Sequence, residues 1–324
     1  MQLKPALRSM CAYALLAGLI PASVSFATQP NDAPPDPFPV IDQDHSELIS
    51  PIVISTKVAS GVQEDIEKVS GIFSAAKKRL SNLSTTLSVE PRTLGVGLLS
   101  KSQLFQKIAG VNVKENTTLF CYCKLHGEVD QNGEALLYLD GWEEPIKRTE
   151  LEDHLKARGA RLTILVTDSC SAAAIPQPKF FGAAAQTKFP LQLFLDLFVN
   201  SKGFVSTNSS SSTVDGQNVY ERAWMDADGA LFTRAFCGFF EERHPDAIKD
   251  LYEKIDKNHN SRFSWQEFFP VVAANTDDTF QVFRSTILSK GLTPAHAPAL
   301  SVKADVQNQS HQTPRPFAAL PDLP

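Results

Sequence analysis

Cysteine is scarce in this chain, with five among 324 residues. Cys11 lies in an N-terminal segment that we expect to be removed, which leaves Cys121, Cys123, Cys170 and Cys237. Cys121 and Cys123 would lie on the same face of one strand, roughly 6 to 7 Å apart, which is poor geometry for a disulfide. The scarcity excludes a disulfide framework, and packing is the expected role of all but Cys170.

The chain also lacks an excess of basic residues. Its formal net charge is −5, and removal of residues 1–27, which contain the cations Lys4 and Arg8 and no anion, would bring it to −7. Neither nucleic acid nor an anionic lipid surface is an expected partner. No internal repeat is visible, and a hydrophobic fraction of 43% is typical of a globular protein.

The N-terminus has the pattern of a secretory signal. Lys4 and Arg8 precede an uncharged run over residues 10–20, and Pro21 and small residues follow up to Ala27. We expect cleavage after Ala27 and export to the periplasm or the extracellular space. The alternative is an uncleaved membrane anchor, because the uncharged stretch is barely long enough to span a bilayer.

Composition divides the rest of the chain into three parts. Residues 28–48 are polar and rich in proline, and residues 291–324 are dense in Pro, Ala and Gln without periodicity, so both are predicted to be disordered. Residues 49–290 are long enough for one substantial hydrophobic core. We predict one folded domain over this range.

Strand and helix patterns alternate within that domain. Such alternation predicts an α/β fold with a mostly parallel central sheet and helices on both faces. Ser100 has the character of a helix N-cap. Strands are expected at 52–55, 118–123, 162–167 and 203–209, and helices at 62–83, 100–108, 149–157, 191–199 and 231–240.

His126 and Cys170 each follow one of the predicted buried strands, 118–123 and 162–167. Reactive side chains gather beyond the carboxyl ends of parallel strands, so the two residues can meet. A thiol with a pKa of about 8.5 is mostly protonated at neutral pH, and a neighbouring imidazole must take its proton before it attacks a carbonyl. The pattern predicts Cys170 as a nucleophile and His126 as its base, although each alone is also typical of packing or a turn.

Gly127 extends this prediction to the oxyanion. A glycine beside the histidine lets the backbone approach a substrate and donate an amide hydrogen bond to the developing negative charge. The amide of Cys170 would be the second donor.

Residues 119–172 resemble the catalytic core of caspases and metacaspases, with His-Gly after one strand and Asp-x-Cys after the next. Residues 203–209 resemble the following strand, and residues 229–235 resemble the Gly-x-Phe-Thr-x-Ala opening of the helix after it in bacterial members. The resemblance implies a caspase-like three-layer sandwich and a metacaspase-like cysteine endopeptidase that acts on a protein or peptide. Bacterial members usually carry Ser-Gly-His-Gly where this chain has Lys124-Leu125-His126-Gly127.

The resemblance also assigns a role to Asp168, two residues before Cys170. Metacaspase-like enzymes place an aspartate there at the floor of the first substrate pocket, and a fixed carboxylate attracts Lys or Arg. The expected cleavage is therefore after a basic residue, with Asp140 as a second wall of the pocket. Asp168 could instead cap a turn, and an Asp-Gly turn explains Asp140 equally well.

A second candidate site is the loop 256–267, which has the ligand spacing of an EF-hand calcium loop. Ser261 replaces the glycine preferred at the sharp turn, so weak affinity is expected, and a purely structural turn explains the loop as well. The predicted ligands are Asp256, Asn258, Asn260, the backbone carbonyl of Arg262, and Glu267.

Together these patterns predict an exported cysteine endopeptidase whose chemistry needs no cofactor, with Ca²⁺ as the one metal that the sequence suggests. Two other interpretations stay open: a catalytically inactive scaffold of the same fold, and a calcium-binding interaction module.

Overall fold

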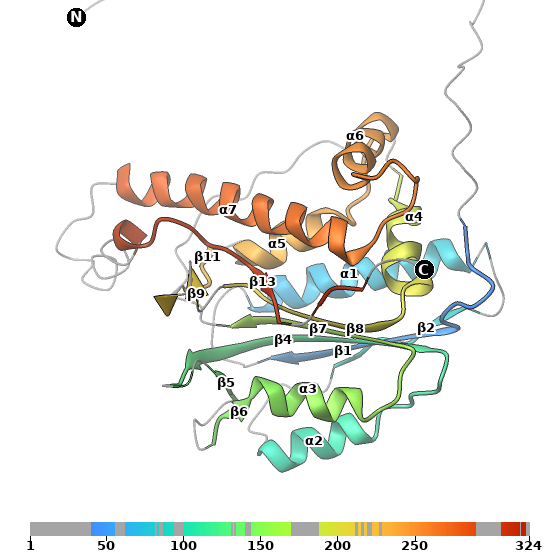
Figure 1. The fold of residues 1–324 in the computed structure, drawn as a ribbon, viewed down its shortest axis with the longest axis horizontal. Coiled ribbons are helices and arrows are strands. Elements are labelled where there is room, and N and C mark those ends of the chain that lie inside the picture. The colour runs from blue at the N-terminus through green and yellow to red at the C-terminus, as the bar shows by residue number, and fades with distance from the viewer. Residues whose placement is uncertain are drawn as a thin grey trace, which may run out of the picture. The chain divides into compact units, whose positions relative to one another are not determined.

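A mixed sheet with a parallel centre forms the middle layer of the folded domain (Figure 1). Among the residues described by this computed structural model the sheet has nine strands, in the order β13-β8-β7-β4-β1-β2 along its main path. β3 pairs with β1, and β5 and β6 extend from β4. The described residues are 40–55, 62–81, 83, 87–93, 100–130, 132, 134–139, 144–169, 188–210, 213–214, 217–218, 222–226, 229–289, 306–317 and 319–321.

The strands of this sheet have the following bounds: β1 (Leu48–Ser55), β2 (Ser88–Val89), β3 (Arg92–Thr93), β4 (Thr117–Val129), β5 (Ala135–Tyr138), β6 (Ile146–Lys147), β7 (Leu162–Ser169), β8 (Gly203–Asn208) and β13 (Arg315–Pro316). Two short antiparallel pairs lie outside it: β9 (Thr213–Val214) with β10 (Gln217–Asn218), and β11 (Met225–Asp226) with β12 (Gly229–Ala230).

Helices cover both faces of the sheet (Figure 1). One face carries α2 (Lys101–Ala109) and α3 (Arg148–Lys156). The other carries α1 (Val62–Leu80), α4 (Leu191–Phe194) with the π-helical segment η1 (Leu195–Asn200), α5 (Leu231–Gly238), α6 (Pro245–Ile255) and α7 (Trp265–Ser289). The predicted three-layer α/β sandwich with a mostly parallel sheet is confirmed.

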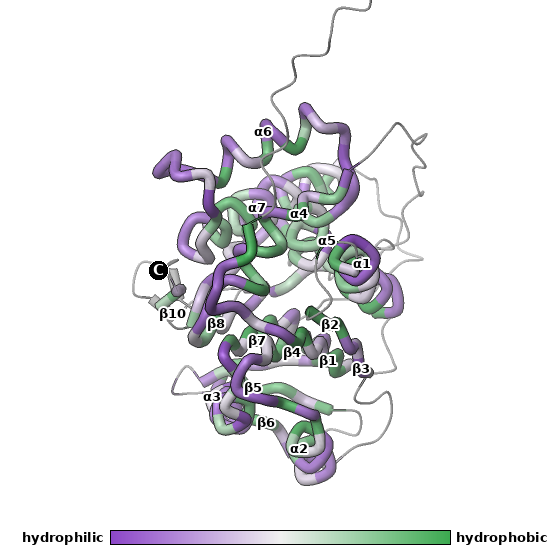
Figure 2. Tube along the Cα trace, turned by 90° about the vertical axis from the view of Figure 1, so that its right-hand side faces the viewer, coloured by the Kyte–Doolittle hydropathy of each residue, from purple (hydrophilic) through white to green (hydrophobic). Residues whose placement is uncertain are grey.

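Side chains alternate between the two faces of the sheet along each strand, and they form two separate hydrophobic cores. In β4, Phe120 and Tyr122 pack towards α1, whereas Leu119, Cys121 and Cys123 pack towards α2 and α3. Figure 2 shows hydrophobic residues gathered in the central strands and in the helices packed on them. Both faces of the parallel strands are thus removed from water, as a parallel sheet requires.

Local sequence signals explain α2 well. Ser100 accepts a hydrogen bond through its side chain from the amide of Gln103 at 3.3 Å, and the Gln103 side chain accepts one from the amide of Ser100 at 3.0 Å. This capping box satisfies two amides that have no partner inside the helix. The predicted N-cap at Ser100 is confirmed.

The folded domain begins earlier than residue 49. Val40 donates its amide to the side chain of Gln192, and the Ser46 amide donates to the carbonyl of Val199 at 2.9 Å. The Ser46 hydroxyl also accepts a hydrogen bond from Thr118. These contacts anchor residues 40–48, so the predicted disordered linker does not extend over them.

Part of the C-terminal tail also differs from the prediction of disorder. β13 pairs antiparallel with the edge strand β8, where Arg315 lies opposite Asn208, and the Phe317 amide donates to the carbonyl of Ser206 at 2.8 Å (Figure 1). The Arg148 guanidinium lies 4.0 Å from the centre of the Phe317 ring. These contacts satisfy the backbone at the sheet edge, which is why a segment without hydrophobic periodicity is held in place.

The predicted signal segment, residues 1–27, lies outside the described residues, and export remains a prediction. Within the part of the chain that the structure describes, no helix has both the length and the apolar character needed to cross a membrane.

Candidate functional site

β4 and β7 are neighbours in the sheet, and their register places the residues just before His126 beside those just before Cys170. The strands are parallel, with Lys124 opposite Asp168 and Leu125 opposite Ser169. His126 follows directly in β4. Cys170 follows Ser169 in the sequence but lies outside the described residues, as does Asp140.

His126 lies inside a strand and not after its end, which differs from the sequence expectation. β4 continues to Val129 because its last part leaves the parallel sheet and pairs antiparallel with β5, with His126 opposite Tyr138 and Gly127 opposite Leu137. His126 is partly exposed at this bend. The histidine therefore has a rigid strand as its support.

Asp168 lies within β7 and is fully buried. Its Oδ1 lies 3.3 Å from the ammonium of Lys124, and its Oδ2 accepts a hydrogen bond from the Thr233 hydroxyl at 2.6 Å. The Thr233 and Tyr122 hydroxyls lie 2.7 Å apart. The carboxylate predicted to line a substrate pocket thus has an internal cation as its counter-ion.

A second buried carboxylate shares this lysine. Asp65, in the first turn of α1, places Oδ2 3.6 Å from the Lys124 ammonium and accepts a hydrogen bond from the Ala230 amide at 2.9 Å. Burial raises the pKa of Asp65 to about 6, Lys124 lowers it and Asp168 raises it further. We call Asp65, Asp168 and Lys124 the buried ionic cluster.

Glycine at position 229 makes the contact between α1 and β12 possible. The Asp65 carboxylate approaches so closely that a β-carbon at Gly229 would lie 2.1 Å from Oδ1. Gly229 also has a backbone φ of +101°, which residues other than glycine rarely adopt. The segment 229–233 thus provides space for Asp65 through Gly229 and a hydrogen bond to Asp168 through Thr233.

Arg148 holds the ends of β7 and β8 together from the opposite side of the sheet. Its buried guanidinium donates to the Thr167 hydroxyl at 3.1 Å, to Glu152 at 2.8 Å, and to the Thr207 carbonyl at 2.7 Å. Burial lowers the pKa of Arg148 to about 10, which leaves it charged at neutral pH. The segment leading to Cys170 is therefore fixed on both faces.

The cysteines that the structure describes are packing residues. Cys121 and Cys123 are fully buried with their sulfur atoms 3.6 Å apart, and Cys237 is buried in α5. Burial raises the pKa values of the Cys121 and Cys237 thiols well above their ordinary range, which disfavours the reactive thiolate. None of these three has the environment of a nucleophile, so Cys170 stays the candidate.

The loop 256–267 adopts a compact conformation in which side-chain oxygens turn inward. Asp256 accepts hydrogen bonds from the amides of Asn260 and Ser261 at 3.0 and 2.9 Å. Asn258 accepts one from the Asn260 amide, and Asn260 accepts one from the Arg262 amide at 2.8 Å. The predicted side-chain ligands at the first, third and fifth positions therefore all accept hydrogen bonds from amides of the loop itself.

The last predicted ligand, Glu267, also faces the loop. One carboxylate oxygen accepts a hydrogen bond from the Asn258 amide at 3.4 Å, and the other accepts from Ser264. Ser261 has φ of +63°, at the position where a calcium loop prefers glycine. The oxygen donors suit a hard cation, but only Asp256 and Glu267 carry formal charge.

Arg262 ties the loop to the domain. Its guanidinium donates to Asp196 and to Asp42, both at 2.9 Å, and the Phe263 amide donates to Asp196 at 3.0 Å. Only its backbone carbonyl was predicted as a ligand. Among the described residues, no group of three or more His, Cys, Asp or Glu side chains is arranged to hold a metal.

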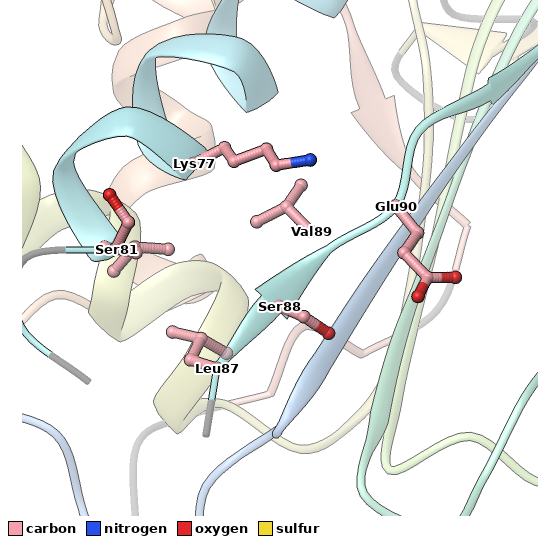
Figure 3. A pocket seen from close by; sticks show the side chains of 7 residues that line it. Lys77, Ser81, Leu87, Ser88, Val89 and Glu90 are labelled. Atoms are coloured by element: carbon pink, nitrogen blue, oxygen red, sulfur yellow. The ribbon is translucent and has the colours of Figure 1, made fainter. Parts of the chain in front are cut away.

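The hollow shown in Figure 3 belongs to a different end of the molecule. It measures about 250 Å³ and is lined by the end of α1 and by β2, with Lys77, Ser81 and Glu90 at its edges. β2 pairs with Leu48 and Ile49 at the start of β1, so the hollow lies near the amino ends of the parallel strands. His126 lies at the opposite end of the sheet, directly after the part of β4 that pairs with β7.

Asp65 was not among the residues predicted from the sequence, and no role was predicted for Lys124 or Thr233. One signal was present, since Lys124 interrupts the apolar run 118–125 in the same alternation phase as Phe120 and Tyr122. A charge at such a position has to meet an opposite charge in the interior. Its partners could be named only once the register of β4 with β7 was known.

Comparisons with solved structures give many matches. The chain is similar to caspase-1 from Spodoptera frugiperda, with 12% sequence identity and a TM-score of 0.46, over 86% of this chain and 90% of that chain. No family model matches the sequence, and no curated protein sequence matches it.

Proposed function

We propose that this protein is a cysteine endopeptidase that uses Cys170 as nucleophile and His126 as general base. The observation that carries the proposal is the register of β4 with β7. Leu125 lies opposite Ser169, and these are the residues that directly precede His126 and Cys170. A parallel pair in this register leads both motifs to the same edge of the sheet, where reactive side chains of α/β proteins gather.

The chemistry follows from these two side chains. His126 takes the thiol proton, the thiolate attacks the carbonyl carbon of a peptide bond, and the amides of Gly127 and Cys170 donate hydrogen bonds to the oxyanion. The histidine then gives its proton to the leaving amine, which leaves a thioester on Cys170. Water hydrolyses the thioester and restores the thiol.

The finer prediction, cleavage after Arg or Lys, requires that a substrate reach the carboxylate of Asp168. In the structure this carboxylate is fully buried and has Lys124 as its counter-ion. We therefore propose peptidase activity without a basic preference.

Hydrolysis of fluorogenic peptides by the purified protein under reducing conditions tests the proposal. The peptides carry Asp, Arg, Lys or a neutral residue before the scissile bond. We expect turnover that Cys170→Ala abolishes and that His126→Ala lowers by about 10²–10⁴-fold. His154→Ala, which removes an exposed histidine of α3, is the matched control and leaves turnover unchanged.

Two outcomes contradict the proposal. Turnover that survives in Cys170→Ala assigns the activity to another group or to a contaminant. Absence of turnover on every peptide favours the inactive scaffold or the calcium-binding interaction module that the sequence left open.

A further inference from the structure

We propose that Lys124 is a specificity-determining residue whose ammonium permanently fills the acidic subsite formed by Asp168 and Asp65, so that the native chain rejects basic side chains there. The location of this subsite beside the reacting groups rests on the proposed function. The occupancy of the subsite by Lys124 rests on the geometry alone.

The position of the cluster relative to the candidate dyad comes from strand alternation. Lys124 and Asp168 are in-register partners on the α1 face of the sheet. His126 follows Lys124 by two residues, and Cys170 follows Asp168 by two residues. Because residues i and i+2 of a strand share a face and lie roughly 6 to 7 Å apart, the ionic cluster is within the reach of one long side chain from His126 in β4.

The charges of the cluster are those of a receptor for a cation. Two carboxylates, both fully buried, face one ammonium that is 2% exposed. Buried carboxylates need a cationic partner, because an unpaired charge in the interior is very costly. Lys124 supplies that partner from within the chain.

The lysine is held by charge and not by hydrogen bonds. The Lys124 ammonium lies 3.3 and 3.6 Å from the two carboxylates. Within the described part of the chain, neither the Lys124 ammonium nor Oδ1 of Asp168 makes a hydrogen bond. The other oxygen of Asp168 is held by Thr233 at 2.6 Å, so the carboxylate is oriented independently of the lysine.

This arrangement has a direct consequence for specificity. A Lys or Arg side chain of a substrate would have to displace a cation that is covalently part of the receptor, and whose effective concentration is therefore high. A shortened side chain at position 124 leaves the carboxylates without a partner and creates a site for an alkylammonium or a guanidinium.

Equilibrium binding in the Cys170→Ala background tests this without any turnover. Lys124→Ala removes both the charge and the volume, whereas Lys124→Met removes the charge but keeps the volume and serves as the matched control. The probes are n-butylammonium and N-acetyl-arginine methylamide, with potassium chloride at equal ionic strength as the reference. The measured quantity is the Tm of each variant.

We expect both probes, at ten times their Kd, to raise the Tm of Lys124→Ala by about 3–6 °C. The Tm of the protein with the native Lys124 and the Tm of Lys124→Met should not change. Addition of Asp168→Asn to Lys124→Ala abolishes the rise. If Lys124→Ala does not fold because its carboxylates repel, Asp65→Asn with Lys124→Ala retains one carboxylate and gives the same readout.

Three results overturn the inference. The first is no rise of the Tm in Lys124→Ala or in Lys124→Ala with Asp65→Asn, and the second is an equal rise of the Tm in Lys124→Met. The third is a preference of the native enzyme for Arg or Lys in the peptide assay. Failure of the proposed function is a separate result, since it appears as absence of turnover on every peptide while the binding data remain readable.

Discussion

Replacement of Asp65 by asparagine removes one of the two buried carboxylates that share Lys124. Burial raises the pKa of Asp65 from 3.8 to about 6, with an opposing effect of Lys124 and a further rise from Asp168. Asparagine has nearly the same shape and keeps an oxygen that accepts the hydrogen bond from the Ala230 amide. The substitution therefore changes mainly the charge.

The sign of the pH dependence follows from the direction of the shift. The pKa of Asp65 is higher in the folded state. Between pH 3.8 and about pH 6 the native chain therefore carries more of this proton than the unfolded chain does. The stability contributed by the group falls as pH rises through this window. A rise of the pKa from 3.8 to about 6 corresponds to about 3 kcal/mol, so the free energy of unfolding of Asp65→Asn should increase by about 3 kcal/mol relative to that of the native chain between about pH 4 and pH 7.

Urea unfolding of both proteins across this pH range measures the difference in the free energy of unfolding. Asp250→Asn, which replaces an exposed aspartate of α6, is the matched control, and its difference from the native chain should stay constant. A constant difference for Asp65→Asn would refute the reasoning. So would a difference that increasingly favours the native chain at higher pH, because it would mean that the ion pair with Lys124 outweighs the cost of burial.

Three further predictions concern single contacts. Thr233→Val leaves Oδ2 of Asp168 and the Tyr122 hydroxyl without this partner, and chemical denaturation should show a loss of about 1–3 kcal/mol; a loss below about 0.5 kcal/mol would contradict the contact. Millimolar Ca²⁺ should raise the Tm of the native chain and raise that of Glu267→Gln less, because the substitution removes one of the two negative charges in the loop; equal responses would exclude Glu267 as a ligand. Phe317→Ala removes the ring beneath the Arg148 guanidinium, so amide hydrogen exchange in β13 should quicken; unchanged exchange would show that backbone pairing alone holds the tail.

Local sequence signals predicted the layers of the fold because they depend on neighbouring residues. The cap at Ser100 and the apolar runs before His126 and Asp168 are such signals, and the resulting helix and parallel strands are present. The extension of β4 beyond His126 could not be predicted, because it requires β5 to fold back as a partner.

Long-range contacts explain what the sequence left undetermined. The role of Asp168 depends on its register with Lys124 and on Asp65, which is far away in the sequence. The tail is held by contacts of the same kind, such as the hydrogen bond from Gln312 to the Ser209 carbonyl at 3.1 Å. No hydrophobic periodicity in the sequence predicts either arrangement.

The alkylation rate of Cys170 is the most direct test of the proposed dyad, because it needs no substrate. Iodoacetamide modification of the native chain and of His126→Ala, followed by mass spectrometry at pH 6 and pH 9, isolates Cys170 from the buried Cys121, Cys123 and Cys237. We predict that loss of the histidine slows alkylation at least about tenfold at pH 6 and has little effect at pH 9, where the thiol ionises without help. Equal rates in the two proteins at pH 6 would contradict a Cys170–His126 dyad.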